Sequence, residues 1–364
     1  MLLTHELNDF MPASVPGDVR VGALSLKESV EHVLMEEGQG HLPCLSLVRQ
    51  GGDLPQVRDA YERLKSFKHV IVLGTGGSSL GARSLAELTR PLFGASTSLP
   101  VLHFMENVDP HTLSALFQHL PVTSTAILAV SKSGSTAETM AQFLCAIDWV
   151  RSQLGEAVLK HHFQIITEPK SSPLRDMAHR YGMPILDHAM DIGGRYSVFS
   201  CVGLLPALLA GVDIDAVRFG ALQVLQDFCT QGALSAPALG ASSCVQLEIE
   251  GCSVNVVMPY CDRLNLLALW HRQLWAESLG KHGQGSLPAP ALGAVDQHSQ
   301  LQLFLEGPKD KFFTIIYGQT QKQGPAFAKD LVESDGRLAY LANRFMGDLL
   351  KAEQNATCRT LVNH

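Results

Sequence analysis

The chain has 364 residues, of which 46% are hydrophobic and 17% charged, and its formal net charge is −7. This balance is typical of a compact globular protein and excludes a disordered chain. Acidic and basic residues are interspersed, which argues against a nucleic-acid-binding or membrane-surface protein. Because this length exceeds what one hydrophobic core usually serves, we expect two domains.

The cysteines, the N-terminus and the apolar stretches indicate where the protein works. Eight cysteines have mostly apolar neighbours and form no C-x-x-C pair, so we expect buried, reduced thiols. The N-terminus carries no basic leader before an apolar run, and no apolar stretch reaches the ~20 residues that span a bilayer. We therefore expect a cytoplasmic protein, and the scattered histidines predict no metal and no other cofactor.

The first half of the chain alternates between strand and helix patterns. Residues 1–60 are predicted to form an N-terminal helical segment. The apolar runs at 70–73 and 126–130 predict strands buried on both faces, and each is followed by a small polar turn and a helical pattern. Further strand patterns follow at "HFQIIT" and "MPILDH". This alternation predicts βαβ units on a parallel sheet.

A second set of patterns follows. Here "GCSVNVVMPY" and "KFFTIIYG" are the predicted strands, with "RLNLLALWHRQLWAESLG" and "HSQLQLFLEG" as the helices between them. We therefore predict an α/β protein with two doubly wound domains, each a mainly parallel sheet flanked by helices. The predicted limits are 61–205 for the first domain and 206–364 for the second.

The turn "GTGGSSLG", residues 74–81, is the first candidate phosphate site. Its glycines let the backbone approach a ligand, and the amides of the next helix point toward an anion. A dinucleotide site requires G-x-G-x-x-G, whereas Gly74, Gly76 and Ser79 give G-x-G-x-x-S and no acid follows the next strand as required. A dehydrogenase is therefore disfavoured, and a purely structural turn remains the alternative.

The turn "SKSGSTAET", residues 131–139, is the second candidate. Its hydroxyls could cap the following helix, with Ser135 or Thr136 paired to Glu138. A cap needs one or two hydroxyls, however, and this turn supplies five. Turns at the carboxyl ends of neighbouring strands form the crevice where open α/β sheets bind ligands. Together the two turns predict a monophosphate ligand.

These segments resemble a known family. The two turns are similar to the paired phosphate turns of sugar isomerase domains, and "DIGGRYSVFSCVGLLPALLAG", "AESLGK" and "DQHSQLQLFLEGP" resemble signature segments of the glucose-6-phosphate isomerase family. The likeness runs in the same order from about residue 60 to residue 318. It implies two sugar-isomerase-type domains, a homodimer with shared active sites and a sugar phosphate as substrate. The residues that it implies for the substrate phosphate are Gly77, Ser78, Ser131, Lys132, Ser133 and Thr136.

Interconversion of an aldose phosphate and a ketose phosphate moves one proton between C1 and C2 through an enediol. A carboxylate can carry the proton, a cation can stabilise the enediolate, and a further acid or base must open the sugar ring. Arg195 follows two glycines that let the backbone pass close to a ligand, and the resemblance makes it that cation. A surface salt bridge is the alternative for this arginine.

Glu277 ends an amphipathic helix, where the helix dipole disfavours a carboxylate. On spacing alone it reads as an exposed glutamate paired with Lys281, but the resemblance makes it the proton-transfer residue. The resemblance likewise makes His298 the ring-opening residue, acting across a dimer interface. Asp296 is the expected N-cap of the helix at His298, and Asp296 and Gln297 are expected to orient its ring.

The end of the chain departs from the family pattern. The family ends with a helix carrying a substrate-facing lysine, and Lys351 in "GDLLKAEQ" does not match that motif. We therefore expect a C-terminally truncated chain with weak activity or none. Two alternatives stay open, a noncatalytic sugar-phosphate-binding regulatory protein and a bifunctional phosphoglucose/phosphomannose isomerase. A regulatory protein need not keep Arg195, Glu277 and His298 together.

Overall fold

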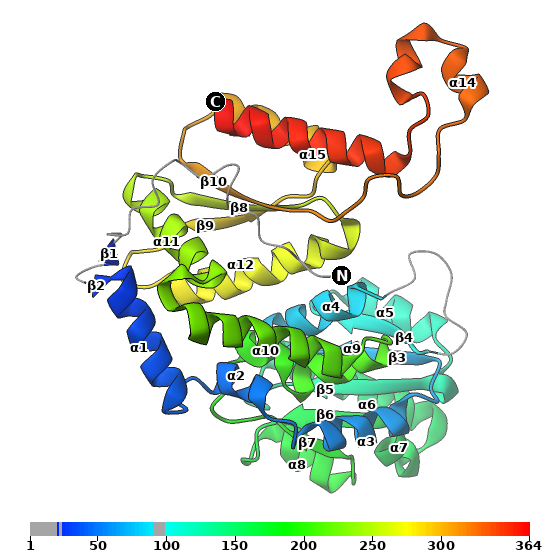
Figure 1. Ribbon diagram of the computed structural model, residues 1–364. Helices are drawn as coiled ribbons and strands as arrows, with labels where there is room; N and C mark the ends of the chain where they lie inside the picture. Colours follow the sequence, from blue (N-terminus) through cyan, green and yellow to red (C-terminus); the bar gives the residue numbers. More distant parts are fainter. Residues whose placement is uncertain (1–19, 22–23, 90–98) are drawn as a thin grey trace. The chain divides into compact units, whose positions relative to one another are not determined.

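The computed structural model describes residues 20–21, 24–89 and 99–364, and the chain forms two compact units (Figure 1). One unit is Val30–Gly232, and the other is Ala233–His364 together with the described residues up to Ser29. The first 19 residues of the expected N-terminal helical segment lie outside the described ranges. The domain limits at residues 60 and 205 stay a prediction, because compactness alone does not define a domain.

The unit Val30–Gly232 is built on a five-stranded, fully parallel sheet in the order β4-β3-β5-β6-β7. The strands are β3 (His69–Leu73), β4 (Val101–Met105), β5 (Thr125–Val130), β6 (Phe163–Thr167) and β7 (Ile185–Asp187). Every residue of β5 and β6 is buried, which is why these strands read as continuous apolar runs. The predicted strands β3, β5, β6 and β7 are confirmed, whereas β4 was not predicted.

Helices cover both faces of this sheet, which confirms the doubly wound α/β fold (Figure 1). One face packs against α3 (Leu54–Leu64), α4 (Leu80–Glu87), α9 (Cys201–Leu209) and the start of α10 (Ile214–Gln231). The other packs against α5 (Pro110–His119), α6 (Ala137–Leu154), α7 (Leu159–His162) and α8 (Pro173–Arg180). Before α3 come the short pair β1 (Arg20–Val21) and β2 (Leu24–Ser25), then α1 (Leu26–Gly38) and α2 (Pro43–Ser46).

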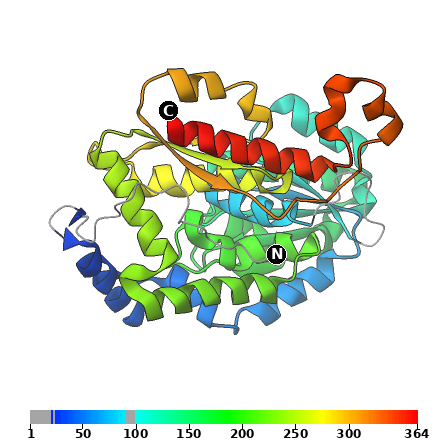
Figure 2. The same ribbon diagram turned by 45° about the horizontal axis from the view of Figure 1, so that its top comes forward.

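The other unit holds a three-stranded parallel sheet in the order β10-β8-β9. Its strands are β8 (Val254–Pro259), β9 (Leu287–Pro290) and β10 (Lys311–Ile316). The sheet packs against α12 (Asn265–Leu279) and against α15 (Met346–Asn363), whose Leu350 and Leu361 join the apolar cluster (Figure 2). β8, β10 and α12 were predicted. β9, which lies between α12 and α13 (Leu301–Glu306), was not predicted.

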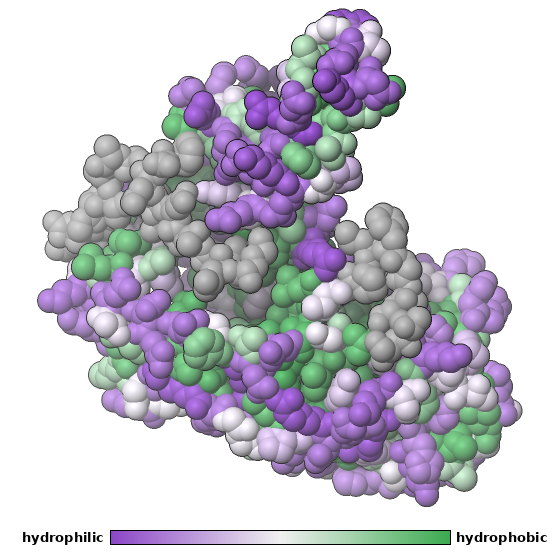
Figure 3. Space-filling view, turned by 45° about the vertical axis from the view of Figure 1, so that its right-hand side comes forward, coloured by the Kyte–Doolittle hydropathy of each residue, from purple (hydrophilic) through white to green (hydrophobic). Residues whose placement is uncertain are grey.

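Three further helices complete this unit: α11 (Ala236–Ile249), α13 (Leu301–Glu306) and α14 (Lys329–Glu333). α14 lies in the segment 318–345, which Figure 3 shows at the top of the view as a mixture of hydrophilic and hydrophobic residues. Leu331 and Tyr340 are among its exposed apolar side chains, at 64% and 68% of their full exposure. Within the described ranges, no helix combines the length and apolar character that a bilayer span requires.

Candidate active site

Two turns meet at the point where the order of the strands reverses. β3 and β5 are neighbours in the sheet, paired from His69–Thr125 to Leu73–Ala129, while the chain proceeds from β3 outward to β4 and from β5 in the opposite direction. The turn 74–81 follows β3 and the turn 131–139 follows β5. Open parallel sheets bind their ligands outside the carboxyl ends of strands at such a reversal. The sheet topology therefore brings both predicted phosphate turns to one ligand-binding position.

The first turn lies directly against the backbone around Arg195. A Cβ atom added to Gly77 would come within 2.3 Å of the Gly194 carbonyl carbon and 2.5 Å of the Arg195 amide nitrogen. The Ser197 hydroxyl donates a hydrogen bond to the Gly77 carbonyl oxygen at 3.2 Å. Only glycine permits this approach at position 77. The structure thus joins the first predicted phosphate turn to the predicted catalytic arginine.

The second turn is organised by its own hydroxyls. Ser131 is buried, and its Oγ lies 3.1 Å from Thr136 Oγ1 and accepts a bond of 3.1 Å from the Gly134 amide. Gly134 has a φ of +65°, a left-handed conformation that glycine adopts at little cost. Ser133 is exposed, with its Oγ 3.5 Å from Thr136 Oγ1.

α6 begins directly after this turn, with Thr136 as its N-cap residue. The Thr136 side chain makes no capping hydrogen bond to the helix, so the capping alternative does not explain this hydroxyl. The N-terminus of an α-helix favours an anion, because its first amides lack intrahelical acceptors and the helix dipole is positive there. Hydroxyl groups and the start of an 18-residue helix therefore coincide at the turn.

Lys132 connects the second turn to the segment that precedes Arg195. Its Nζ donates hydrogen bonds to the carbonyl oxygens of Met190, at 2.9 Å, and Ile192, at 2.8 Å. It also lies 3.4 Å from a carboxylate oxygen of Glu168. The ammonium group therefore holds the segment before Arg195 in place, and it adds a positive charge to the turn.

Sequence reasoning missed two buried titratable residues beside this lysine. Glu168 directly follows β6 and is 4% exposed, and the Lys170 ammonium, together with Lys132, holds the pKa of Glu168 below its ordinary value although burial acts in the opposite direction. His188 follows β7, and burial lowers its pKa. Their positions in the sequence could have identified both residues, because each directly follows the last residue of a strand. No group of three possible metal ligands from His, Cys, Asp and Glu occurs among the residues that the structure describes.

Arg195 lies in the 3₁₀ segment Gly194–Phe199 and is half-buried. Its guanidinium carbon is 4.5 Å from the centre of the Tyr196 ring, a distance typical of a cation–π contact. The backbone contact at Gly77 and the bonds from Lys132 fix this segment from two sides. The unit Val30–Gly232 therefore holds seven of the nine predicted site residues in three connected segments.

The other two predicted residues, Glu277 and His298, belong to the other unit. Glu277 is exposed in the last turn of α12, where the Gln273 amide donates to its carboxylate at 3.2 Å. His298 is exposed and directly follows the 3₁₀ segment Val295–Gln297.

The expected role of Asp296 as a helix cap was wrong. α13 begins at Leu301, and the Asp296 carboxylate instead accepts bonds from the Leu292 amide at 2.6 Å and the Ser299 hydroxyl at 2.5 Å. Burial acts to raise the pKa of Asp296, but these bonds leave it below its ordinary value. Gln297 donates to the Tyr260 hydroxyl. Neither side chain bonds to the His298 ring, so the expectation that they orient it was also wrong.

The chain is similar to known proteins over most of its length. Residues 59–288 match the family model described as phosphoglucose isomerase. Glucose-6-phosphate isomerase of Rubrobacter xylanophilus is 37% identical over 338 residues, which cover 90% of this chain and 77% of that protein. A crystal structure of a hypothetical protein from Thermus thermophilus is 34% identical, with a TM-score of 0.81 over 93% of this chain and 80% of that chain.

A glucose-6-phosphate isomerase from Chlamydia trachomatis shares the fold, with 21% identity and a TM-score of 0.67 over 93% of this chain and 62% of that chain. The family match covers more than half of the chain, and it includes both phosphate turns, Arg195 and Glu277. The chain therefore belongs to the phosphoglucose isomerase family.

Proposed function

We propose that this chain interconverts glucose 6-phosphate and fructose 6-phosphate through a cis-enediolate. The observation that carries the proposal is the junction of three segments in the unit Val30–Gly232. Two hydroxyl-rich turns lie at the reversal of the strand order, and Gly77 contacts the backbone of Arg195. Such a junction suits a phosphorylated substrate whose reacting carbons lie close to a cation. The glucose-6-phosphate isomerases that resemble the chain support the choice of substrate.

The phosphate group is proposed to bind at the two turns. Hydroxyl and amide donors there would satisfy its oxygens, and the start of α6 would add the favourable helix dipole. Lys132 would contribute positive charge while its ammonium group holds the segment that leads to Arg195. The proposed set is Gly77, Ser78, Ser131, Lys132, Ser133 and Thr136.

Three residues are proposed to carry the chemistry. Glu277 would move the proton between C1 and C2, because a carboxylate can accept it from one carbon and return it to the other. Arg195 would stabilise the negative charge that develops on the enediolate oxygen. His298 would transfer the proton that opens the sugar ring. The reaction moves atoms within one molecule, so these proton transfers and one fixed positive charge account for it.

The test is a coupled assay in which glucose 6-phosphate formed from fructose 6-phosphate is oxidised by an added dehydrogenase. We expect weak turnover by the wild-type chain, because Lys351 does not match the substrate-facing lysine of the family pattern. Glu277→Gln should lose a further factor of about 10² to 10⁴ in kcat, since general acid–base catalysis contributes about that factor. Glu306→Gln is the matched control, because Glu306 also ends a helix and is exposed.

The results of this assay test the proposed reaction and the choice of Glu277 as the base separately. A wild-type chain that binds the sugar phosphate without turnover would support the regulatory alternative and contradict the proposed reaction. Full activity of Glu277→Gln would overturn only the choice of base. Parallel assays with mannose 6-phosphate would show whether the enzyme is bifunctional.

We also propose that the protein acts as a cytoplasmic homodimer with shared active sites. All eight cysteines are free thiols, which suits a reducing compartment, but the expectation that they are buried was wrong for Cys145 and Cys229, which are exposed. The exposed apolar side chains of segment 318–345, including Leu331 and Tyr340, are suited to contact with a second copy. Sedimentation of the purified chain tests the dimer.

A further inference from the structure

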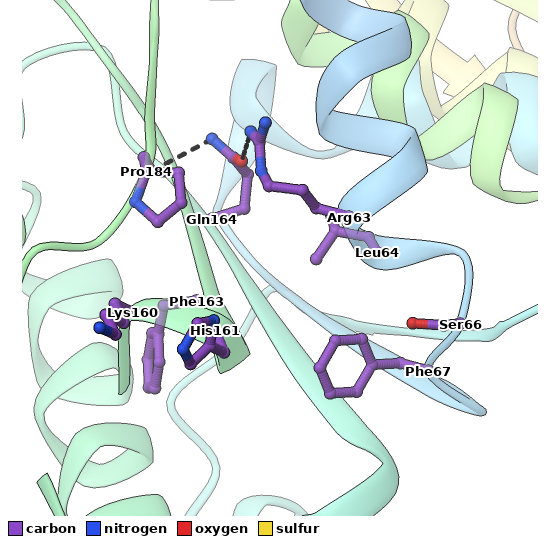
Figure 4. Close-up of a pocket in the computed structure, with 9 residues that line it drawn as sticks. All are labelled: Arg63, Leu64, Ser66, Phe67, Lys160, His161, Phe163, Gln164 and Pro184. Atoms are coloured by element: carbon purple, nitrogen blue, oxygen red, sulfur yellow. Dashed lines mark hydrogen bonds between the residues drawn. The ribbon is translucent and has the colours of Figure 1, made fainter. Parts of the chain in front are cut away.

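A pocket of about 300 Å³ lies at the amino ends of the strands of the five-stranded sheet. The predicted phosphate turns lie at the opposite, carboxyl ends. The walls of the pocket come from the end of α3 and the turn after it, from the junction of α7 with β6, and from Pro184 just before β7 (Figure 4). β6 and β7 start here, whereas the phosphate turns follow the ends of strands that run in the same direction. The pocket is therefore distinct from the proposed active site.

The lining of the pocket is basic. Arg63, Lys160 and His161 line it, and none of its nine lining residues is acidic, although the chain as a whole has a net charge of −7. Within the described part of the chain, the side chains of Lys160 and His161 have no hydrogen-bond or ion-pair partner, and neither has the hydroxyl of Ser66. These donors can therefore serve a ligand without breaking an existing bond.

The Arg63 guanidinium is held in place by a buried amide. Its Nη2 donates to Gln164 Oε1 at 2.5 Å, and Gln164 is only 1% exposed. The Gln164 amide nitrogen in turn donates to the carbonyl oxygens of Ile165, at 3.1 Å, and Pro184, at 3.2 Å. One of the five N–H donors of the guanidinium is used in this way. A cation whose position is already fixed loses less conformational entropy when it binds an anion.

The remaining walls are apolar. Figure 4 shows Phe67 across the pocket from Phe163, with Arg63 and Gln164 along a third side. Phe67 is held by an edge-to-face contact with His162, whose ring centre is 5.1 Å away. Phe163 is fully buried in the sheet. A volume of about 300 Å³ lies at the lower limit of small-molecule sites, which combine apolar walls with a few polar groups, so the pocket suits only a small ligand.

We propose that this pocket binds a small organic anion, a phosphate or carboxylate group on a short apolar body. The anionic group would lie among Arg63, Lys160 and His161, and the apolar body would contact Phe67 and Pro184. This inference is independent of the proposed isomerase reaction, since it uses none of the same residues.

The test is calorimetric titration of the whole chain with phenyl phosphate, benzoate and inorganic phosphate. We expect phenyl phosphate to bind at the pocket, and Arg63→Gln or Lys160→Gln to weaken that binding at least tenfold, about 1.4 kcal/mol. Comparison of phenyl phosphate with benzoate distinguishes a phosphate from a carboxylate head group, and weaker binding of inorganic phosphate would show that the apolar body contributes. Lys65→Gln is the matched control, because Lys65 is an exposed cation close to Arg63 that does not line the pocket.

Phenyl phosphate can also bind at the phosphate turns, so the two sites are separated by variants. Thr136→Ala should weaken binding at the turns and leave the pocket signal unchanged, whereas Arg63→Gln should do the reverse and keep the wild-type kcat. Melting curves identify a variant that has failed to fold. If Arg63→Gln fails to fold, Lys160→Gln still tests the pocket, because Lys160 is exposed and its replacement should leave the fold intact. Unchanged affinity in both pocket variants, or no pocket signal up to about 10 mM phenyl phosphate, overturns the proposal.

Discussion

Gly77 is the residue on which the junction of the candidate site depends. Replacement by alanine would place a methyl group within 2.5 Å of backbone atoms of Gly194 and Arg195, and backbone atoms cannot move aside as a flexible side chain can. We expect Gly77→Ala to lower stability by about 1–3 kcal/mol, the usual range for overpacking. It should also lower kcat/KM, because the Arg195 segment has to shift. Urea unfolding and the coupled assay measure the two effects.

Gly220 provides the control for this substitution. It lies within α10, and an added Cβ would have no neighbour within 4 Å. Since glycine in a helix interior costs about 1 kcal/mol relative to alanine, Gly220→Ala should stabilise the protein slightly and leave kcat/KM unchanged. Equal effects of the two substitutions would contradict the role given to Gly77.

At the scale of elements, Arg218 ties α10 to the segment that carries Arg195. Its guanidinium donates to both carboxylate oxygens of Asp53, at 2.7 and 2.5 Å, and to the carbonyl oxygen of Phe199, at 2.7 and 3.1 Å. Arg218 is 4% exposed. Arg218→Ala should therefore cost about 3 kcal/mol, because a partly buried carboxylate and a backbone carbonyl lose their partner. Chemical denaturation measures the change.

Arg58 is the matched control for Arg218. It forms an ion pair with Asp215, at the start of the same helix, but both side chains are about half exposed. Solvent screens such pairs, so Arg58→Ala should cost less than about 1 kcal/mol. A cost for Arg218→Ala as small as that of Arg58→Ala would show that the buried pair does not hold the elements together.

The elements also show what the sequence could predict and what it could not. β3 and β5 were predictable, because strands buried on both faces leave uninterrupted apolar runs before their turns. β9 was not, since "LPAP" has prolines where a strand normally carries β-branched residues. The hydroxyls of the two predicted phosphate turns could likewise be recognised in the sequence. The contact between Ser197 and Gly77 was not, because these residues are 120 positions apart and no local pattern records a long-range contact.

At the scale of the whole molecule, Glu168 links stability to pH. The Lys170 and Lys132 ammonium groups keep its folded-state pKa below the ordinary value of 4.5. The unfolded chain therefore binds the proton more readily. The stabilisation is complete above about pH 4.5 and is lost as the pH falls through the folded-state pKa. We expect urea midpoints of the wild type and Glu168→Gln to converge between about pH 6 and pH 3. Glu62→Gln is the control, because Glu62 forms an exposed ion pair with Lys65, and its urea midpoint should differ little from that of the wild type at every pH. A difference between wild type and Glu168→Gln that stays constant with pH would contradict the linkage.

The prolines of β9 also determine which hydrogen-bond donors the sheet offers at its edge. Among the described strands β9 lies at the edge of its sheet. The Leu287 amide donates to the carbonyl oxygen of Ser253, just before β8, and the Ala291 amide to that of Val257 in β8. Residues at even positions between them direct their nitrogens outward, and these are Pro288 and Pro290, which have no N–H to donate. The outer edge of β9 therefore lacks, at these two positions, the N–H donors that another strand would need to extend the sheet. The two prolines that made this strand hard to predict from the sequence thus also remove the donors through which a further strand could pair with it.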